Sequence, residues 1–257
     1  MPPARTFPTE AIVLKRLDYA EADRIITVLT PHHGKLRLLA KGVRRVTSRQ
    51  AGHLDLFTHA HVMVVRGRSL DLVTQATTLS SFWEVRESLT RASYAFHLAE
   101  MVDAFVQDED EHRPVFDLLR DALGALSGEA PLDLVARHFE MHLLAEVGFR
   151  PQLDACVACD AVLVPATNGY SVPRGGAFCP ACAPHEPSAV AIDVSTLKML
   201  RLLQRTASAR SLGVRAPRAV LEDVEMVLRR QVEYSLDRRL RAADFVRVVA
   251  AVPPGLT

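Results

Sequence analysis

The sequence contains no run of eighteen apolar residues, so nothing in it predicts a helix that spans a membrane. Its opening stretch, MPPARTFPTEAIVLK, lacks the apolar core of a signal peptide, and we therefore expect a cytoplasmic protein. Cysteine is scarce, with 4 residues in a chain of 257. In a reducing compartment, four cysteines indicate metal or redox chemistry more often than disulfides.

Motifs of the common nucleotide-binding and hydrolytic enzymes are also missing. Gly34-Lys35-Leu36 lacks the upstream glycine and the hydroxyl of a phosphate-binding loop, and neither G-x-G-x-x-G nor G-x-S-x-G occurs. Residues 138–142 read HFEMH, in which phenylalanine replaces the catalytic glutamate of an H-E-x-x-H zinc protease. His138 and Glu140 also form an H-x-E, which zinc deaminases combine with a downstream P-C-x-x-C. Here Ala155 and Phe178 stand before the two cysteine pairs where that proline would be. We expect a binding protein and not an enzyme.

Charge is segregated along the chain, although the net charge is only +1. Residues 1–80 carry 12 basic and 6 acidic side chains, residues 81–150 carry 6 and 14, and residues 151–257 carry 13 and 10. Residues 24–54 contain seven Lys or Arg side chains and three histidines but no carboxylate. A polyanion is attracted to the first segment and repelled by the second. A solvated face would explain an ordinary charge run, but this segregation favours nucleic-acid binding.

The first eighty residues predict a small β-barrel, because turn residues such as PHHG at 31–34 separate short β-rich runs. Five short strands in about seventy residues fit the OB-fold, a five-stranded Greek-key barrel that binds nucleic acids. An SH3-like barrel fits the same pattern. The runs are residues 10–17, 24–30, 35–41, 56–66 and 69–77.

The third run separates apolar from basic side chains. Leu36, Leu38 and Ala40 fall on one face, and Lys35, Arg37 and Lys41 fall on the other, with Leu39 among them. The apolar face should fill the barrel while the basic face points outward. Gly42 then leads into a basic loop. Six phosphate contacts would give single-strand binding a log–log salt slope of about −4. The barrel has few aromatic residues for base stacking, which favours binding to the nucleic-acid backbone without sequence preference; they are Phe7, Tyr19 and Phe57.

Helical patterns follow from residue 81. Ser81 and Glu84 form a capping box before a long predicted helix that extends to Phe105. Pro114 and Pro131 should open two further helices that end at Gly128 and Gly148. DEDEH at 108–112 is predicted to be a solvated loop, and helices return at residues 193–207 and 219–240.

Two C-x2-C pairs, separated by nineteen residues, interrupt the helices. This spacing is typical of a structural zinc site, in which two tight turns each supply two thiolates to one tetrahedral ion. The segment between the pairs resembles the hairpin of a zinc ribbon, with Asn168-Gly169 as a turn signal. The predicted ligands of one structural Zn²⁺ are Cys156, Cys159, Cys179 and Cys182.

Several short patterns extend over nearly the whole chain. They are Tyr19-x-Glu21-x-Asp23, Thr30-x-x-x-Gly34-Lys35, Ala40-Lys41-Gly42-x-Arg44-Arg45, Ser48-Arg49, Leu54-x-x-Phe57, Gly148-Phe149-Arg150-Pro151 and the closing helix through Tyr234 to Phe245. In combination they resemble the bacterial RecO family of recombination mediators.

The resemblance implies an OB-fold, a helical domain and, in many members, a zinc-binding module. It implies binding to single-stranded and double-stranded DNA, annealing of complementary strands, and partnership with the ring-forming RecR. It also implies binding to the C-terminal tail of single-strand binding protein and a location near the nucleoid. With RecR, such a protein helps to load RecA on DNA covered by single-strand binding protein, so RecA is an indirect partner. DNA contacts are expected at Lys35, Arg37, Lys41, Arg44, Arg45 and Arg49, with Arg24 as a further candidate at the start of the basic segment.

The sequence thus predicts an α+β multidomain protein. Its parts are an OB-fold barrel at residues 1–79, a helical domain at 80–150 and 189–257, and a four-cysteine zinc-ribbon-like insert at 151–188. The predicted function is that of a non-enzymatic DNA-repair mediator. A zinc-ribbon and barrel protein that acts on RNA or in transcription remains the alternative, since contacts to the 2′-hydroxyl would favour RNA.

Overall fold

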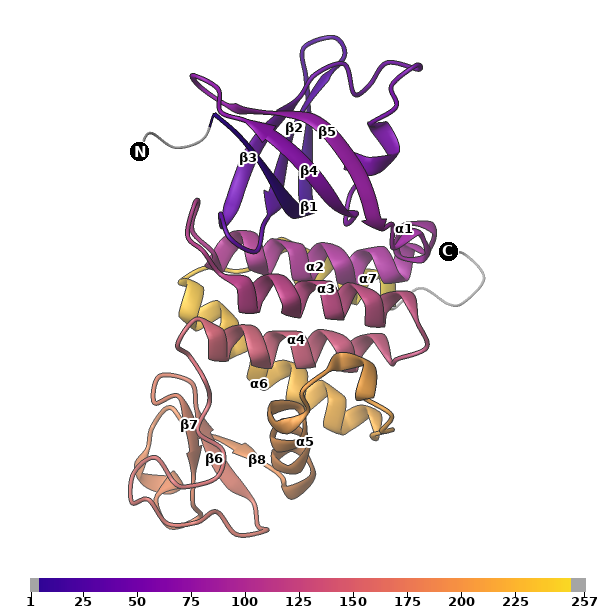
Figure 1. Ribbon diagram of the computed structural model, residues 1–257. Helices are drawn as coiled ribbons and strands as arrows, with labels where there is room; N and C mark the ends of the chain where they lie inside the picture. Colours follow the sequence, from indigo (N-terminus) through magenta and orange to yellow (C-terminus); the bar gives the residue numbers. More distant parts are fainter. Residues whose placement is uncertain (1–4, 251–257) are drawn as a thin grey trace. The chain divides into compact units, whose positions relative to one another are not determined.

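The structure is a computed structural model that describes residues 5–250 (Figure 1). The chain forms two compact units. The first comprises the described residues up to Ser127 together with those from Arg241 onward, and the second extends from Gly128 to Leu240. Among the described residues, no helix is both long enough and apolar enough to cross a membrane. The two units group the barrel with some of the helices, whereas the sequence predicted a separate barrel, helical domain and cysteine insert. The boundaries of those three parts therefore stay predictions.

A closed five-stranded barrel begins the first unit, with the strand order β1-β2-β3-β5-β4. All neighbouring strands are antiparallel except β3 and β5, which pair in parallel. This Greek-key closure is that of an OB-fold. The sequence was compatible with either an OB-fold or an SH3-like barrel, and the strand order identifies the OB-fold. The strands are β1 (Thr6–Tyr19), β2 (Asp23–Leu29), β3 (Lys35–Ala40), β4 (His59–Val65) and β5 (Asp71–Ser80).

The barrel interior is aliphatic. The alternation predicted for β3 is confirmed for its inward apolar residues and for Arg37, but Lys35, which was predicted to belong to the exposed basic face, is buried. Leu36, Leu38 and Ala40 lie in the barrel core, while Arg37 is exposed on the outer face. The short connection between β2 and β3 turns at Gly34, whose φ of +61° lies in the left-handed region. A Cβ atom there would lie 2.3 Å from the carbonyl oxygen of Asp110, so glycine allows the loop at residues 108–112, here called the acidic loop, to approach the barrel.

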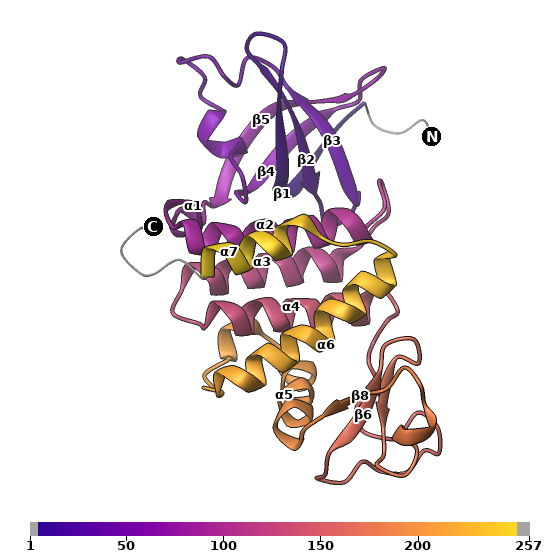
Figure 2. The ribbon, with the colours of Figure 1, turned by 180° about the vertical axis from the view of Figure 1, so that it is seen from behind.

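Four helices complete the first unit. Phe57 packs edge-on against Phe96 of α2, with 5.0 Å between ring centroids, and His59 packs against Phe116 of α3. Figure 2 shows α7 alongside α2, and Glu100 of α2 accepts hydrogen bonds from two backbone N–H groups at the start of α7. The helices are α1 (Trp83–Glu87), α2 (Leu89–Phe105), α3 (Arg113–Ser127) and α7 (Arg241–Ala250).

The long helix predicted from residue 81 is divided, and the capping-box prediction was wrong. Ser88 is extended and separates α1 from α2, and its hydroxyl accepts a hydrogen bond from the N–H of Arg91. No side chain caps α1, which Phe82 precedes in a left-handed conformation. A serine that can cap the second helix therefore competes with helix continuation at this point.

The second unit contains three helices and a small three-stranded sheet, ordered β7-β6-β8. The predicted turn at Asn168-Gly169 was wrong, because both residues lie in β6 and the chain turns instead between Ser171 and Gly176. The elements are α4 (Leu132–Glu146), β6 (Asn168–Ser171), β7 (Gly176–Phe178), β8 (Val190–Ile192), α5 (Val194–Arg205) and α6 (Arg218–Leu236).

Candidate nucleic-acid interface and metal centre

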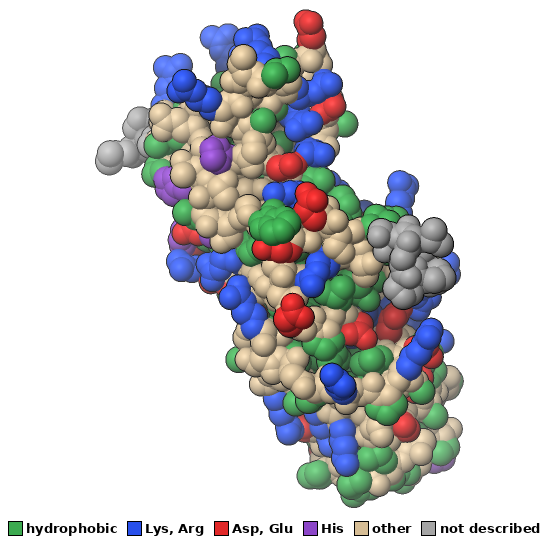
Figure 3. Space-filling model, turned by 90° about the vertical axis from the view of Figure 1, so that its right-hand side faces the viewer, with side chains coloured by type: hydrophobic (Ala, Val, Ile, Leu, Met, Phe, Trp, Pro, Cys, Tyr) green, Lys and Arg blue, Asp and Glu red, His purple; other side chains and the backbone are tan. Residues whose placement is uncertain are grey.

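Basic side chains of the predicted interface lie on β3 and on the loop that follows it. Lys41, Arg45 and Arg49 are exposed, as is Arg37 on the outer face of β3. Figure 3 shows Lys and Arg side chains crowded at the upper end of the barrel. The loop is held at its base, since Asp23 accepts a hydrogen bond of 2.7 Å from the N–H of Gly42. The strand and this anchored turn hold four exposed cations on one part of the barrel.

Two other predicted contacts share a carboxylate. Asp18 Oδ1 accepts a hydrogen bond of 2.9 Å from Nε of Arg24, and Asp18 Oδ2 lies 3.4 Å from Nε of Arg44. The hydrogen bond from Arg24 and the charge of Arg44 lower the pKa of the Asp18 carboxyl, so it is ionised at neutral pH. Asp18 therefore offsets positive charge that a phosphate would otherwise meet.

Lys35, in contrast, is not an exposed cation, although it lies on the same strand as Arg37. Its side chain is only 11% exposed, and its ammonium lies 3.3 Å from carboxylate oxygens of both Asp103 and Asp108. The carbonyl oxygen of Lys35 also accepts a hydrogen bond from the N–H of Glu109. Lys35 thus holds the acidic loop against the barrel. The sequence pattern of basic residues does not indicate this role.

Replacement of Asp18 with asparagine is expected to strengthen DNA binding. The change frees the guanidinium group of Arg24 for phosphate oxygens and removes a negative charge beside Arg44, which is already a proposed contact. We expect an affinity gain of about threefold at moderate salt, measured by fluorescence anisotropy. Asp223→Asn, at an exposed position on α6, makes the same change in net charge and should have no such effect. Equal gains in the two variants would contradict a local role for Asp18.

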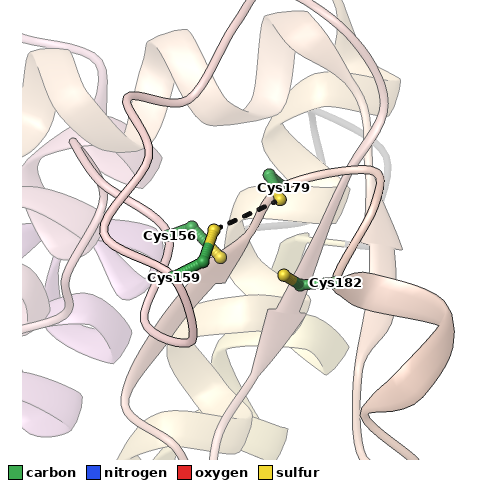
Figure 4. A group of neighbouring side chains, drawn as sticks. All are labelled: Cys156, Cys159, Cys179 and Cys182. Carbon is green, nitrogen blue, oxygen red and sulfur yellow. Dashed lines mark hydrogen bonds between the residues drawn. The ribbon is translucent and has the colours of Figure 1, made fainter.

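The four predicted zinc ligands come together in the second unit. Their sulfur atoms all lie within 4.8 Å of one another, and 3.9 Å separates Cys159 Sγ from Cys179 Sγ (Figure 4). A tetrahedral ion with Zn–S bonds of about 2.3 Å requires sulfur atoms about 3.8 Å apart. The four thiols form one cluster that can hold a metal ion.

Each C-x2-C pair forms a tight turn. The carbonyl oxygen of Cys156 accepts a hydrogen bond from the N–H of Asp160, and that of Cys179 accepts one from the N–H of Cys182. The N–H of Val157 donates to the carbonyl oxygen of Ala177, which fastens the first turn to strand β7. The β6–β7 hairpin therefore sets the separation of the two pairs.

The environment of the buried Cys156 favours its thiolate. Burial raises the pKa of this thiol, but hydrogen bonds from backbone N–H groups, that of Cys179 first among them, outweigh burial and lower the pKa to about 6. The thiolate is the form that binds metal. With four thiol groups and no additional ligand among the described residues of the cluster, the site fits a structural ion and leaves no coordination position for a substrate.

The HFEMH segment has a different environment from that of a zinc protease. Nε2 of His138 lies 2.9 Å from the carbonyl oxygen of Thr206, and Nε2 of His142 lies 3.1 Å from that of Leu203. Each ring nitrogen must donate a proton to its carbonyl partner, so neither Nε2 can serve as a metal ligand there. These histidines connect α4 to the end of α5 and the residue that follows it.

Comparison with known families covers nearly the entire chain. Residues 5–82 match the model described as "Recombination protein O N terminal", and residues 86–244 match "Recombination protein O C terminal". The two matches meet just after the barrel, at the start of the helices.

Curated relatives agree with these matches. The chain is 41% identical over 242 residues to the DNA repair protein RecO of Roseiflexus sp. (strain RS-1), which covers 94% of this chain and 85% of the relative. It is 33% identical to DNA repair protein RecO of Dehalococcoides mccartyi (strain ATCC BAA-2266 / KCTC 15142 / 195), over 92% of this chain and 93% of that protein. The corresponding protein of Pelotomaculum thermopropionicum is 32% identical over 98% of this chain and 97% of its own. The barrel, the helices and the sequence matches together place the chain in the RecO family.

Proposed function

We propose that this protein is a non-enzymatic mediator of DNA repair and homologous recombination, which binds single-stranded and double-stranded DNA through its barrel. The observation that carries the proposal is the group of exposed cations on β3 and the following loop, in a barrel of the OB type. Such cations attract any phosphate backbone and release counterions when they bind it. The proposed contacts are Arg37, Lys41, Arg44, Arg45 and Arg49, with Arg24 available when Asp18 releases it.

Lys35 contributes to this proposal indirectly. Its ammonium is engaged by Asp103 and Asp108, so we assign it the role of holding the acidic loop in place. The acidic loop then lies at one end of the basic surface and repels phosphate from that side. A DNA backbone is expected to pass from Arg37 toward the loop at residues 41–49 and not toward α2.

Annealing follows from the same charges. Two complementary strands repel each other through their phosphates, and a positive surface reduces that repulsion while it keeps both strands close. No bond is made or broken, so the function needs no catalytic residue. The acidic segment after the barrel limits the surface available to DNA.

The partners proposed are those of the family: RecR, the C-terminal tail of single-strand binding protein and, indirectly, RecA. A pocket of about 550 Å³ in the first unit supports binding of the tail of single-strand binding protein. Phe96 and Phe245 line its apolar part. Its polar part contains Lys15, Arg16 and Arg241 together with Glu100, and Lys15 and Arg16 are paired with Asp103 and Asp55, so Arg241 is the cation proposed to meet the peptide. An acidic peptide with apolar side chains is complementary to such a pocket.

We further propose that the four cysteines bind one Zn²⁺ as a structural ion. Support comes from the four clustered sulfur atoms and from the backbone N–H groups around Cys156. In this role the ion stabilises the β6–β7 hairpin and the two turns that carry the cysteines, and it takes no part in binding DNA.

An annealing assay tests the proposal. We expect the protein to accelerate pairing of two complementary labelled oligomers at least tenfold over the spontaneous rate at low salt, and to lose this effect at high salt. Fluorescence energy transfer between the strands reports the rate. An annealing rate equal to that without protein, under conditions in which the protein binds DNA, would contradict the annealing function.

A further inference from the structure

The outer face of β1, β2 and β3 carries an apolar row among its charges. Strand register aligns Leu17 with Ile25, and Ile25 with Leu39, and the parallel β3–β5 pairing aligns Leu39 with Leu72. None of these side chains belongs to the barrel core. Leu17 is 62% exposed, and the other three are half-buried. We name this row of four side chains the outer stripe.

Tyr19 extends the outer stripe along β1. Residues two apart on a strand face the same side and lie about 6.6 Å apart, so Tyr19 stands next to Leu17 on the outer face. Tyr19 is 50% exposed. It is the only exposed member of the three barrel aromatic residues, because Phe57 is buried and Phe7 packs against His33 and Arg66.

Charges suited to a nucleic-acid backbone flank the outer stripe. Arg37 lies two residues before Leu39 on β3, opposite Thr27 of β2, and Lys41 lies two residues after Leu39, directly beyond the end of β3. A pocket of about 440 Å³ opens here, lined by Leu17, Ile25 and Arg37 among others. At its far edge Lys15 and Lys35 are both paired with Asp103. The unpaired positive charge therefore lies toward Arg37 and Lys41.

Apolar side chains between cations match a single strand and not a duplex. The bases of a single strand can turn their faces onto a protein surface, whereas in a duplex those faces are stacked inside the helix. Base–protein stacking tolerates any sequence, because every base has a π-face. A duplex could use the flanking cations but would leave the outer stripe in contact with water.

We propose that the outer stripe and Tyr19 form a base-binding platform that selects single-stranded over double-stranded nucleic acid. This inference rests on the proposed function, since it names how the same barrel surface distinguishes two forms of DNA. Arg37 and Lys41 hold the phosphates on either side, while nucleobases pack on Leu17, Tyr19 and Leu39. Contacts between bases and the platform contribute affinity that does not depend on salt. Contacts between cations and the nucleic-acid phosphates contribute affinity that does.

Binding of the full-length chain to three labelled probes tests the platform. The probes are an oligo-dT strand, an abasic strand of the same length and a duplex, each measured by fluorescence anisotropy. The abasic strand keeps the phosphates but has no bases. We expect oligo-dT to bind about tenfold more tightly than the abasic strand.

Leu17→Ser and Tyr19→Ala should each reduce that preference by about fivefold. In both variants the affinity for the abasic strand and the duplex should stay unchanged. Both side chains are exposed, so the variants should fold, and thermal unfolding checks this. The matched controls are Leu79→Ser, a comparably exposed leucine at the end of β5 outside the outer stripe, and Tyr234→Ala on α6.

Two results would overturn the platform while leaving the proposed function intact. One is equal binding of oligo-dT and the abasic strand by the unaltered protein. The other is a full preference for oligo-dT in the Leu17 and Tyr19 variants. Failure to bind any of the three probes at low salt would instead overturn the proposed function, and the platform with it.

Discussion

Replacement of Lys41, Arg45 and Arg49 with glutamate is expected to weaken DNA binding on the order of 100-fold at moderate salt, if each lost phosphate contact contributes about 1 kcal/mol. These three cations are exposed on one loop, and the anchored turn at Gly42 holds that loop in place. The log–log salt slope for a single strand should become shallower by about 2, because three phosphate contacts each contribute about 0.7. Anisotropy titrations across a salt series measure both quantities.

A variant with the same change in total charge separates a local effect from a global one. Arg215, Arg238 and Arg239 are exposed in the second unit, and their replacement with glutamate also lowers the net charge by about six. We expect this control to bind DNA within about threefold of the unaltered protein. Equal losses in the two variants would show that overall charge, and not the barrel surface, determines the affinity.

Removal of metal from the four-cysteine cluster is expected to unfold the β6–β7 hairpin and the two cysteine turns. Structural zinc contributes on the order of 10 kcal/mol to the folding of small modules, and the described strands of this hairpin have only three and four residues. Treatment with a strong chelator, or the variant Cys159→Ser, should therefore abolish protection from hydrogen exchange in residues 168–178. Exchange measured by mass spectrometry gives the comparison with the intact protein.

Barrel amides provide the internal control for this experiment. The barrel core contains none of the four cysteines, so β1 to β5 should keep their protection and the protein should still bind single-stranded DNA. Elemental analysis should find about one zinc per chain. Purified protein without metal, in which the hairpin amides are nevertheless protected, would show that the module folds by packing alone.

Much of the fold follows from local patterns. The five strands lie close to their predicted positions, because turn residues bound them and because inward positions such as Leu36, Leu38 and Ala40 alternate along β3. The cysteine cluster follows from spacing, since two tight turns on one hairpin bring four sulfur atoms together. The choice between an OB-fold and an SH3-like barrel depended on the parallel pairing of β3 with β5, which joins distant segments.

Other features depend on contacts that no local pattern encodes. Lys35 belongs to the basic segment by sequence, yet Asp103 and Asp108 from far along the chain neutralise it. Asp18 similarly engages Arg24 and Arg44 across a hairpin and a loop. The division of the helix at Ser88 arises because a serine hydroxyl caps the next segment, which competes with the apolar spacing that predicted one long helix.

The outer stripe also became visible only through strand register. Alternation in the sequence placed Leu39 on the outward face, but Leu17 and Ile25 are unremarkable there, because each belongs to a strand with other apolar residues. A shift of one residue in the strand register would turn these three side chains toward the barrel core. The bulge in β1 between Val13 and Lys15 makes such a shift, so it affects which face of the sheet Leu17 occupies. Pairing in three dimensions places these side chains in one row on the outer face.

The salt dependence of DNA binding by the intact protein tests the central claim most directly. Single-stranded and double-stranded oligomers, titrated in parallel by anisotropy, should both bind at low salt and weaken steeply as salt rises. With five cations at the interface, we expect log–log slopes of about −3.5 for the single strand and about −4.5 for the duplex. Absence of binding at low salt, or affinities independent of salt, would contradict a DNA-backbone site on this barrel.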